Sequence, residues 1–262
     1  AMVGRSLDNQ FPKEYGKRSE KPMLEVRNLS RSGVLHDISF RAYGGEVLGF
    51  SGLVGAGRTE TMRAIFGADP IDSGEILVKG KKVKIRSPRD AIREKIAFLT
   101  EDRKGQGLVL AESIQNNLIL ANLKGFSRGL FLNKNKIRTQ GEKRMSELSI
   151  KATGQEERVG QLSGGNQQKV VIGKWINTDA DIYIFDEATR GIDVGAKVEV
   201  YQVINQLVKE GKCVIMVSSE MPEILGMSDR VIVMREGRIT GEMGRETDAF
   251  NQEDVMKAAW EV

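Results

Sequence analysis

The chain has 262 residues, 40% hydrophobic and 29% charged, which is typical of a globular domain large enough to bury a sizeable core. No apolar run approaches the roughly 18 residues that cross a bilayer, and the N-terminus lacks the apolar block of a signal peptide. The single cysteine, Cys213, excludes an internal disulfide and is predicted to be a buried strand thiol.

The charge balance argues against a nucleic-acid partner. The net charge is +4 and aromatic residues make up only 6% of the chain, whereas nucleic-acid proteins concentrate basic residues and interleave aromatics. Basic residues are spread out except at 13–21 and 134–144. We favour the interpretation that the excess of basic residues forms a solvated face near anionic lipid headgroups.

The pattern along the chain predicts an α/β domain. Residues 1–22 are rich in charges, glycine and proline, which indicates a linker, and the globular part starts at 23. Strands are expected at 23–26, 38–43, 46–51, 75–78, 82–85, 96–99, 182–185, 214–218 and 231–235. Helices are expected at 58–66, 88–95, 114–123, 134–148, 166–176 and 197–209. Strands alternating with helices predict a mostly parallel sheet, and the helical run near 112–177 predicts a lobe.

A glycine-rich loop follows the expected strand at 46–51 and opens a helix, which is the context of a phosphate loop. Its backbone N–H groups and the helix N-terminus would bind phosphates, and the Thr59 hydroxyl would bind Mg²⁺. The competing interpretation is a plain strand–turn–helix corner. The candidate ATP-binding residues are Gly52, Gly55, Ala56, Gly57, Arg58, Thr59 and Glu60.

Two residues of this loop depart from the usual pattern. Arg58 stands where a phosphate-loop lysine is expected, and a planar forked guanidinium binds phosphate with a different geometry from an ammonium. Glu60 places a carboxylate in the first helical turn, where it competes with phosphate. Nucleotide binding is expected here, and efficient hydrolysis is not.

Two further motifs carry chemistry. Asp186 and Glu187 end an apolar strand, where Asp186 would hold Mg²⁺ and Glu187 would polarise a water molecule; a solvated strand-end pair is the alternative. Residues Ser163, Gly164 and Gly165 precede a helix that is expected to start near Asn166. Such a hydroxyl and glycine N–H groups form an anion site, unless they only cap the helix.

The glycine loop, the stretch LSGGNQQ and the run IYIFDE, in this order, resemble the ATP-binding cassette (ABC) ATPases. The combination GLVGAGRTE, TEDRKGQGL, LSGGNQQKV, DEATRGIDVGAK and SSEMPEILGMSDR is similar to the second, C-terminal nucleotide-binding domain of tandem ATPases of bacterial ribose- and galactose-type importers. The resemblance implies a P-loop NTPase fold with an ABC-type core of mostly parallel sheet, an antiparallel β subdomain and a helical lobe. It implies an inter-domain linker at 1–22, with the cassette at 23–262.

The resemblance also assigns roles and partners. Glu187 would be the catalytic acid, with Thr59 and Asp186 holding Mg²⁺; Ser163, Gly164, Gly165 and Asn166 would complete an ATP site on the first domain of the same subunit. The implied cofactors are ATP and Mg²⁺. Implied partners are that first domain, transmembrane permease subunits and, indirectly, a periplasmic sugar-binding protein. The implied location is peripheral, on the cytoplasmic face of the bacterial inner membrane.

Arg58, Glu101 and Ser219 depart from ABC ATPases generally but suit this second domain. Ser219 stands where a switch histidine is usual, Glu101 stands where a glutamine is usual, and Asp193 belongs to the expected D-loop. The only histidine, His36, is predicted to lie on the surface or a strand edge. Tyr43 is a weak candidate for adenine stacking and is more typical of packing within its strand.

The expected function is therefore ATP binding and hydrolysis that powers sugar import, with a weak site of its own. The alternative is a catalytically silent half that binds nucleotide and only gates and docks. A third class, an ABC protein that acts on nucleic acid or ribosomes, has no support in the charge pattern.

Overall fold

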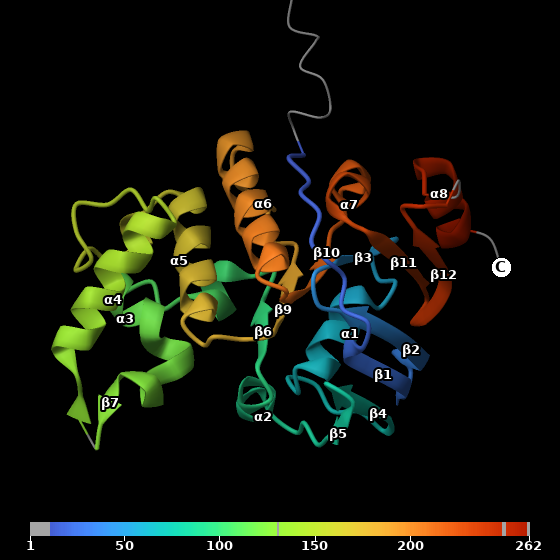
Figure 1. Ribbon diagram of the computed structural model, residues 1–262, viewed down its shortest axis with the longest axis horizontal. Helices are drawn as coiled ribbons and strands as arrows, with labels where there is room; N and C mark the ends of the chain where they lie inside the picture. Colours follow the sequence, from blue (N-terminus) through green and yellow to red (C-terminus); the bar gives the residue numbers. More distant parts are fainter. Residues whose placement is uncertain (1–10, 130, 248–249, 261–262) are drawn as a thin grey trace, which may run out of the picture. The chain divides into compact units, whose positions relative to one another are not determined.

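A computed structural model describes residues 11–129, 131–247 and 250–260 (Figure 1). The chain forms two compact units. The first comprises residues up to 98, 181–187 and 201–262, and the second comprises residues 99–180 and 188–200. Part of the expected linker, residues 1–10, lies outside the described residues.

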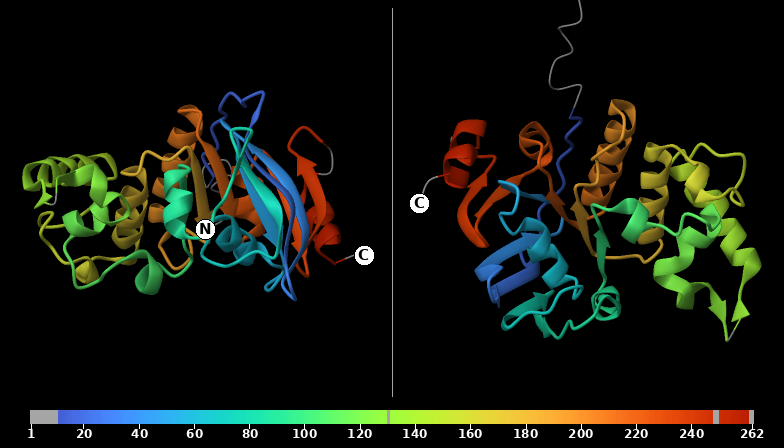
Figure 2. Two further views of the ribbon diagram at one scale, coloured as in Figure 1. Left: turned by 90° about the horizontal axis from the view of Figure 1, so that it is seen from below. Right: turned by 180° about the vertical axis from the view of Figure 1, so that it is seen from behind.

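The first unit contains two sheets (Figure 2). Their strands are β1 (Pro22–Arg31), β2 (Leu35–Tyr43), β3 (Val47–Gly52), β4 (Ser73–Val78), β5 (Lys81–Val83), β6 (Ile96–Leu99), β9 (Ile182–Asp186), β10 (Cys213–Val217), β11 (Arg230–Arg235) and β12 (Arg238–Gly244). Four strands form an antiparallel sheet in the order β2-β1-β4-β5, and six form a second sheet in the order β12-β11-β3-β10-β9-β6. The helices are α1 (Arg58–Ile65), α2 (Pro88–Arg93), α7 (Met221–Met227), α8 (Gln252–Trp260) and the last part of α6 (Val194–Lys209).

The six-stranded sheet brings three loops to one edge. Strands β3, β9, β10 and β11 pair in parallel, and β12 pairs antiparallel with β11. All residues of β9 and β10 are buried, as is typical of parallel strands covered on both faces. Because Val217 pairs with both Asp186 and Phe50, the carboxyl ends of three strands lie at one level. The predicted fold class, with its parallel core, antiparallel sheet and helical lobe, is confirmed.

The second unit consists mainly of helices. They are the π-helical turn η2 (Arg103–Gly107), α3 (Ile114–Ile119), the 3-10 segment η3 (Leu120–Phe126), α4 (Lys134–Glu147), η4 (Val159–Gln161), α5 (Gly164–Ile176) and the beginning of α6. A small hairpin pairs β7 (Ser127–Arg128) with β8 (Phe131–Leu132). Most residues of α5 are buried, so this helix forms the centre of the unit.

One predicted helix is interrupted. The expected helix at 114–123 ends as α3 at Ile119, because Asn122 adopts a non-helical backbone conformation (φ −142°, ψ 45°). The Asn122 side chain donates to the Asn177 carbonyl (2.8 Å) and accepts from the Gly125 N–H (3.1 Å). The gain of these two hydrogen bonds offsets the loss of helix continuity.

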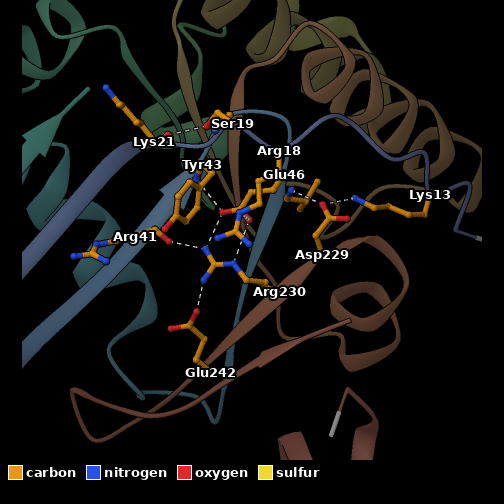
Figure 3. A network of polar contacts seen from close by, with 12 residues as sticks. Lys13, Arg18, Ser19, Lys21, Arg41, Tyr43, Glu46, Asp229, Arg230 and Glu242 are labelled. Carbon is orange, nitrogen blue, oxygen red and sulfur yellow. Dashed lines mark hydrogen bonds and ion pairs between the residues drawn. The ribbon is translucent and has the colours of Figure 1, made fainter. Parts of the chain in front are cut away.

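An N-terminal strap, residues 11–21, packs along the first unit (Figure 3). The Phe11 ring lies 5.7 Å from the ring of Tyr201 in α6. The Lys13 ammonium lies 2.8 Å from the Asp229 carboxylate, although 216 positions separate the two residues. The described part of the expected linker is therefore docked on the domain that follows it.

The strap also reaches a buried ionic network around Glu46, which is 1% exposed (Figure 3). The Arg230 guanidinium donates to both Glu46 carboxylate oxygens, at 2.8 and 3.1 Å, and Arg18 lies 3.4 Å from the same group. The Tyr43 ring centre lies 3.9 Å from the Arg18 guanidinium and 5.4 Å from that of Arg230. Tyr43, at the end of β2, therefore lies beside two guanidinium groups.

Burial shifts the pKa of two side chains, Cys213 and Lys174. Burial raises the pKa of the Cys213 thiol in β10, which confirms the buried, unreactive cysteine that was predicted. Burial lowers the pKa of Lys174 in α5 to about 8. The Lys174 ammonium donates to the Gly107 carbonyl at 2.6 Å and so ties α5 to the loop that ends at η2.

We expect Lys174 to make the stability depend on pH. Between about pH 8 and the ordinary lysine pKa of 10.5, the unfolded state binds a proton that the folded state has lost. The free energy of unfolding of the wild type should therefore rise with pH, relative to Lys174→Met, across this interval. Urea unfolding of both proteins from pH 7 to pH 10 measures the difference. Parallel stability curves would contradict the assignment.

Candidate functional site

The glycine loop connects β3 with α1 in the first unit. Gly52 has φ 145° and Gly57, which caps α1, has φ 97°. A Cβ atom on Gly52 would lie 2.2 Å from the Met234 carbonyl oxygen, and one on Gly57 would lie 3.0 Å from the Gly237 Cα. Both positions therefore require glycine, for conformation and for space.

The outer part of this loop is open. Val54 is 94% exposed, and a Cβ atom on Gly55 would meet nothing within 4 Å. Ala56 is buried, and its carbonyl accepts from the Gly237 N–H at 2.9 Å, which anchors the base of the loop. An anchored loop with accessible backbone N–H groups before a helix N-terminus is a suitable anion site.

Thr59 and Asp186 lie together beside the loop. The Thr59 hydroxyl donates to the Asp186 carboxylate at 3.1 Å, and Asp186 ends the buried strand β9. A hydroxyl and a carboxylate are ligands that Mg²⁺ accepts. No group of three or more His, Cys, Asp or Glu side chains suited to a metal exists within the described ranges. Mg²⁺ in proteins usually takes one or two carboxylate or hydroxyl ligands and completes its shell with water and phosphate oxygens.

Glu187 is held in a defined position by its neighbours. Its backbone is left-handed (φ 50°), and its N–H donates to the Val217 carbonyl at 2.9 Å. Its carboxylate accepts from the Ser219 hydroxyl at 3.1 Å and lies 3.8 Å from the Arg58 guanidinium. The structure thus brings together three predicted residues from three separate loops. A left-handed conformation is costly for glutamate and is typical of functional positions.

Arg58 is buried and has a second partner that sequence analysis missed. Its guanidinium donates to the Ser218 carbonyl at 2.6 Å. The Ser218 hydroxyl in turn donates to the buried carboxylate of Glu223 and accepts from the Glu220 N–H at 3.0 Å. The loop after β10 is therefore fixed by its own side chains and holds Arg58 from one side. The first turn of α1 also carries Glu60, which is half-buried.

The signature residues lie in the second unit. Ser163 caps α5, and its hydroxyl accepts from the Asn166 N–H at 3.5 Å and from the Asn166 side-chain amide at 3.1 Å. The Asn166 side-chain oxygen Oδ1 accepts from the Lys151 N–H at 2.9 Å, which joins the signature to the preceding loop. A Cβ atom on Gly165 would lie 2.7 Å from the Ala196 Cβ, so α6 begins in close contact with α5.

Arg103 connects the signature with the loop that follows β9. Its guanidinium donates to the carbonyls of Arg190 (2.9 Å) and Gly191 (3.2 Å). A Cβ atom on Gly164 would lie 2.9 Å from the same guanidinium. Glu101 forms an ion pair with Arg190, and the Asp193 carboxylate accepts from the Ala196 N–H at 3.0 Å. The altered loop at 101–103, the expected D-loop and the signature thus form one polar cluster.

The predicted site residues therefore fall into two groups. Residues of the glycine loop, Asp186, Glu187 and Ser219 belong to the first unit, whereas Glu101, Asp193 and the signature belong to the second. His36 is half-buried on β2, in agreement with the predicted strand position. None of the helices among the described residues combines the length and hydrophobicity that crossing a bilayer requires.

The fold and the first group of residues define a P-loop nucleotide-binding domain. The chain belongs to the ABC transporter family, whose sequence profile matches residues 35–190.

The chain is similar in sequence to known import proteins and in structure to a solved cassette. It is 52% identical over 258 residues to the ribose import ATP-binding protein RbsA of Oceanobacillus iheyensis, covering 98% of this chain and 51% of that protein. It is 49% identical over 259 residues to a putative ribose/galactose/methyl galactoside import ATP-binding protein of Burkholderia ambifaria, covering 98% and 50%. The chain thus spans about half the length of these relatives. A dimeric ATP-binding cassette with bound ADP and Pi has the same fold (TM-score 0.72, 19% identity, 86% and 100% covered).

We expect Arg58→Ala to destabilise the first unit. The variant loses the charge-assisted hydrogen bond from the guanidinium to the Ser218 carbonyl, and the Glu187 carboxylate loses its positively charged neighbour. Together these losses should lower the free energy of unfolding by about 1.5–3 kcal/mol. Arg63→Ala on the same helix is the matched control, since Arg63 is about one-third exposed and its partner Asp69 keeps a second ion pair, with Arg31. That change should cost less than about 1 kcal/mol. Equal losses in urea unfolding would show that the contacts of Arg58 contribute little.

Proposed function

We propose that this chain is an ATP-binding and ATP-hydrolysing cassette domain that energises sugar import through a membrane permease. The observation that carries the proposal is the arrangement at the sheet edge, where Thr59 contacts Asp186 and where Arg58 and Ser219 surround Glu187. The printed names of relatives that are about half identical, which are ribose and galactose import ATP-binding proteins, support the transported substrate class.

The chemistry follows from the residues at this edge. Backbone N–H groups of 52–59 would bind the phosphates, and Thr59 and Asp186 would hold Mg²⁺, directly and through water. When bound, Mg²⁺ neutralises charge on the phosphate oxygens. Glu187 would orient and polarise the water that attacks the γ-phosphate in line, and Ser219 keeps its carboxylate in place.

We further propose that the signature of this chain acts on a different nucleotide. Ser163 and the N–H groups that begin α5 form an anion site suited to the γ-phosphate of an ATP bound by another cassette. The dimeric form of the structurally similar cassette supports such pairing. This chain would be the C-terminal, second domain of a tandem subunit, and residues 1–22 would connect it with the first. Its length, about half that of its relatives, is consistent with this organisation.

The site built on the glycine loop is proposed to be the weaker of the two. Arg58 replaces the phosphate-loop lysine, Ser219 replaces the switch histidine and Glu101 replaces the loop glutamine. The Arg58 guanidinium is directed to Ser218 and Glu187, which leaves fewer of its donors for phosphate. The second candidate function, a catalytically silent half that binds nucleotide and gates, rests on the same contacts.

The proposed role in sugar import implies a set of partners. They are the first nucleotide-binding domain, the transmembrane permease subunits and, indirectly, a periplasmic sugar-binding protein. The cluster of Glu101, Arg103 and Arg190 is the surface that we assign to the permease, since it links an exposed loop to the signature. The proposed location is peripheral, at the cytoplasmic face of the inner membrane. A nucleic-acid partner is not proposed.

The isolated chain should bind Mg-ATP or Mg-ADP, because the glycine loop keeps its glycines, its open face and the Thr59 hydroxyl. Isothermal titration at millimolar nucleotide measures the affinity. Gly57→Asp should abolish binding, since it adds a side chain where space is lacking and places a negative charge beside the phosphates. The control is Gly80→Asp, at a turn with positive φ and open space, which should bind as the wild type does. No heat of binding by the wild type would refute the nucleotide site.

In a full-length tandem subunit, Ser163→Ala or Gly164→Asp should remove most ATPase activity, because the signature would serve the stronger site on the other domain. Glu187→Gln should reduce the activity less, since it affects only the weaker site. Steady-state phosphate release from purified subunit in complex with its permease measures both. Equal losses would mean that the two sites are equivalent, and nucleotide binding by the isolated chain would be unaffected by that result.

A further inference from the structure

The β7–β8 hairpin of the second unit exposes an apolar tip. Phe131 is 79% exposed and Leu132 is 48% exposed, and both lie in β8. The preceding segment η3 adds Leu123, which is 45% exposed. In Figure 1 the hairpin protrudes from the helices of its unit. Phe131 and Leu132 are adjacent in β8, so together they form a small exposed apolar surface of the kind that a partner can cover.

The base of the hairpin is fixed. Phe126, Ile119 and Ile137 form a small buried cluster beneath it. The Asn133 N–H donates to the Phe126 carbonyl at 2.8 Å, and the Asn133 side chain caps α4 by accepting from the Lys136 N–H at 3.1 Å. Phe131 and Leu132 therefore extend from a well-packed base. The Phe131 side chain itself stays exposed.

The hairpin and its flanks carry mainly positive charge. Between Glu112 and Glu142 the sequence has no Asp or Glu and has five basic residues, all exposed: Lys124, Arg128, Lys134, Lys136 and Arg138. Of these, Arg138 lies 3.7 Å from the Glu142 carboxylate. Within the described ranges, no ion pair involves Lys124, Arg128 or Lys134, and the Lys136 ammonium donates to the Gly125 carbonyl at 2.7 Å. Arg128 and Lys134 line a hollow together with Phe131 and Leu132. Apolar and cationic groups thus occupy one surface.

We propose that the β7–β8 hairpin inserts its tip into the interfacial region of an anionic lipid membrane. Phe131 and Leu132 would enter the boundary between headgroups and acyl chains, and the basic residues would contact the lipid phosphates. The aliphatic Leu132 and Leu123 favour lipid over nucleic acid, where stacking needs aromatic rings and Phe131 is the only exposed aromatic of the hairpin. This inference goes beyond the proposed function, since it gives the chain a membrane contact independent of the permease.

Sedimentation of the purified chain with vesicles tests the proposal. Vesicles of one part phosphatidylglycerol to one part phosphatidylcholine should bind the chain, and vesicles of phosphatidylcholine alone should bind it at least roughly tenfold more weakly. Raising the salt from low to high concentration should weaken binding to the anionic vesicles, because the charge attraction is screened.

Two hairpin variants and two controls separate the contributions. Phe131→Ser/Leu132→Ser and Arg128→Glu/Lys134→Glu should each reduce partitioning by roughly tenfold or more. The controls make the same kinds of change on the first unit, at exposed Trp260 (Trp260→Ser) and at exposed Lys84 and Arg89 (Lys84→Glu/Arg89→Glu), and should bind normally. Thermal unfolding verifies that all four variants are folded. A fluorescent probe is Phe131→Trp, whose emission should shift to the blue on anionic vesicles.

Other results would overturn the proposal. These are the absence of binding to anionic vesicles, equal loss in hairpin and control variants, and full binding by Phe131→Ser/Leu132→Ser, which would reduce the effect to bulk charge. Displacement of the chain from vesicles by a single-stranded oligonucleotide at lower concentration than the lipid would favour a nucleic-acid surface instead.

Discussion

Parallel pairing of β9, β10 and β3 is the constraint on which the candidate site depends. The pairing places Asp186, Val217 and Phe50 at one level, so the three loops that follow begin side by side. The contacts Thr59–Asp186, Arg58–Glu187 and Ser219–Glu187 all cross between these loops. A slip of one residue in β9 would turn Asp186 to the other face of the sheet and remove the arrangement.

In the polar cluster of the second unit, side-chain contacts hold the loops together. There, the Arg103 guanidinium bridges the backbone carbonyls of Arg190 and Gly191 and lies close to Gly164. The ion pair of Glu101 with Arg190 adds to this connection. The loop at 101–107 is therefore joined by polar contacts to residues 190–191, and it lies close to Gly164 of the signature.

Short motifs with obligatory geometry could be predicted from the sequence. Gly52 and Gly57 have positive φ, and Thr59 lies beside Asp186, as a phosphate loop requires. Partners far apart in sequence could not be predicted: Arg58 and Ser218 are 160 positions apart, and no pattern connects them. Strand β12 was also missed, because its residues alternate between exposed and half-buried and give little hydrophobic signal. Helices α7 and α8 were not predicted either.

The strap imposes an order on folding. Lys13 pairs with Asp229, and at about 5–20 residues per second a ribosome needs roughly 10–40 s to make the 216 residues between them. The strap is thus synthesised long before most of its partners in α6, α7 and β11 exist. Phe11, whose ring later meets Tyr201, must remain exposed through that interval. Phe11 and Lys13 can therefore dock only after Tyr201 and Asp229 have been synthesised.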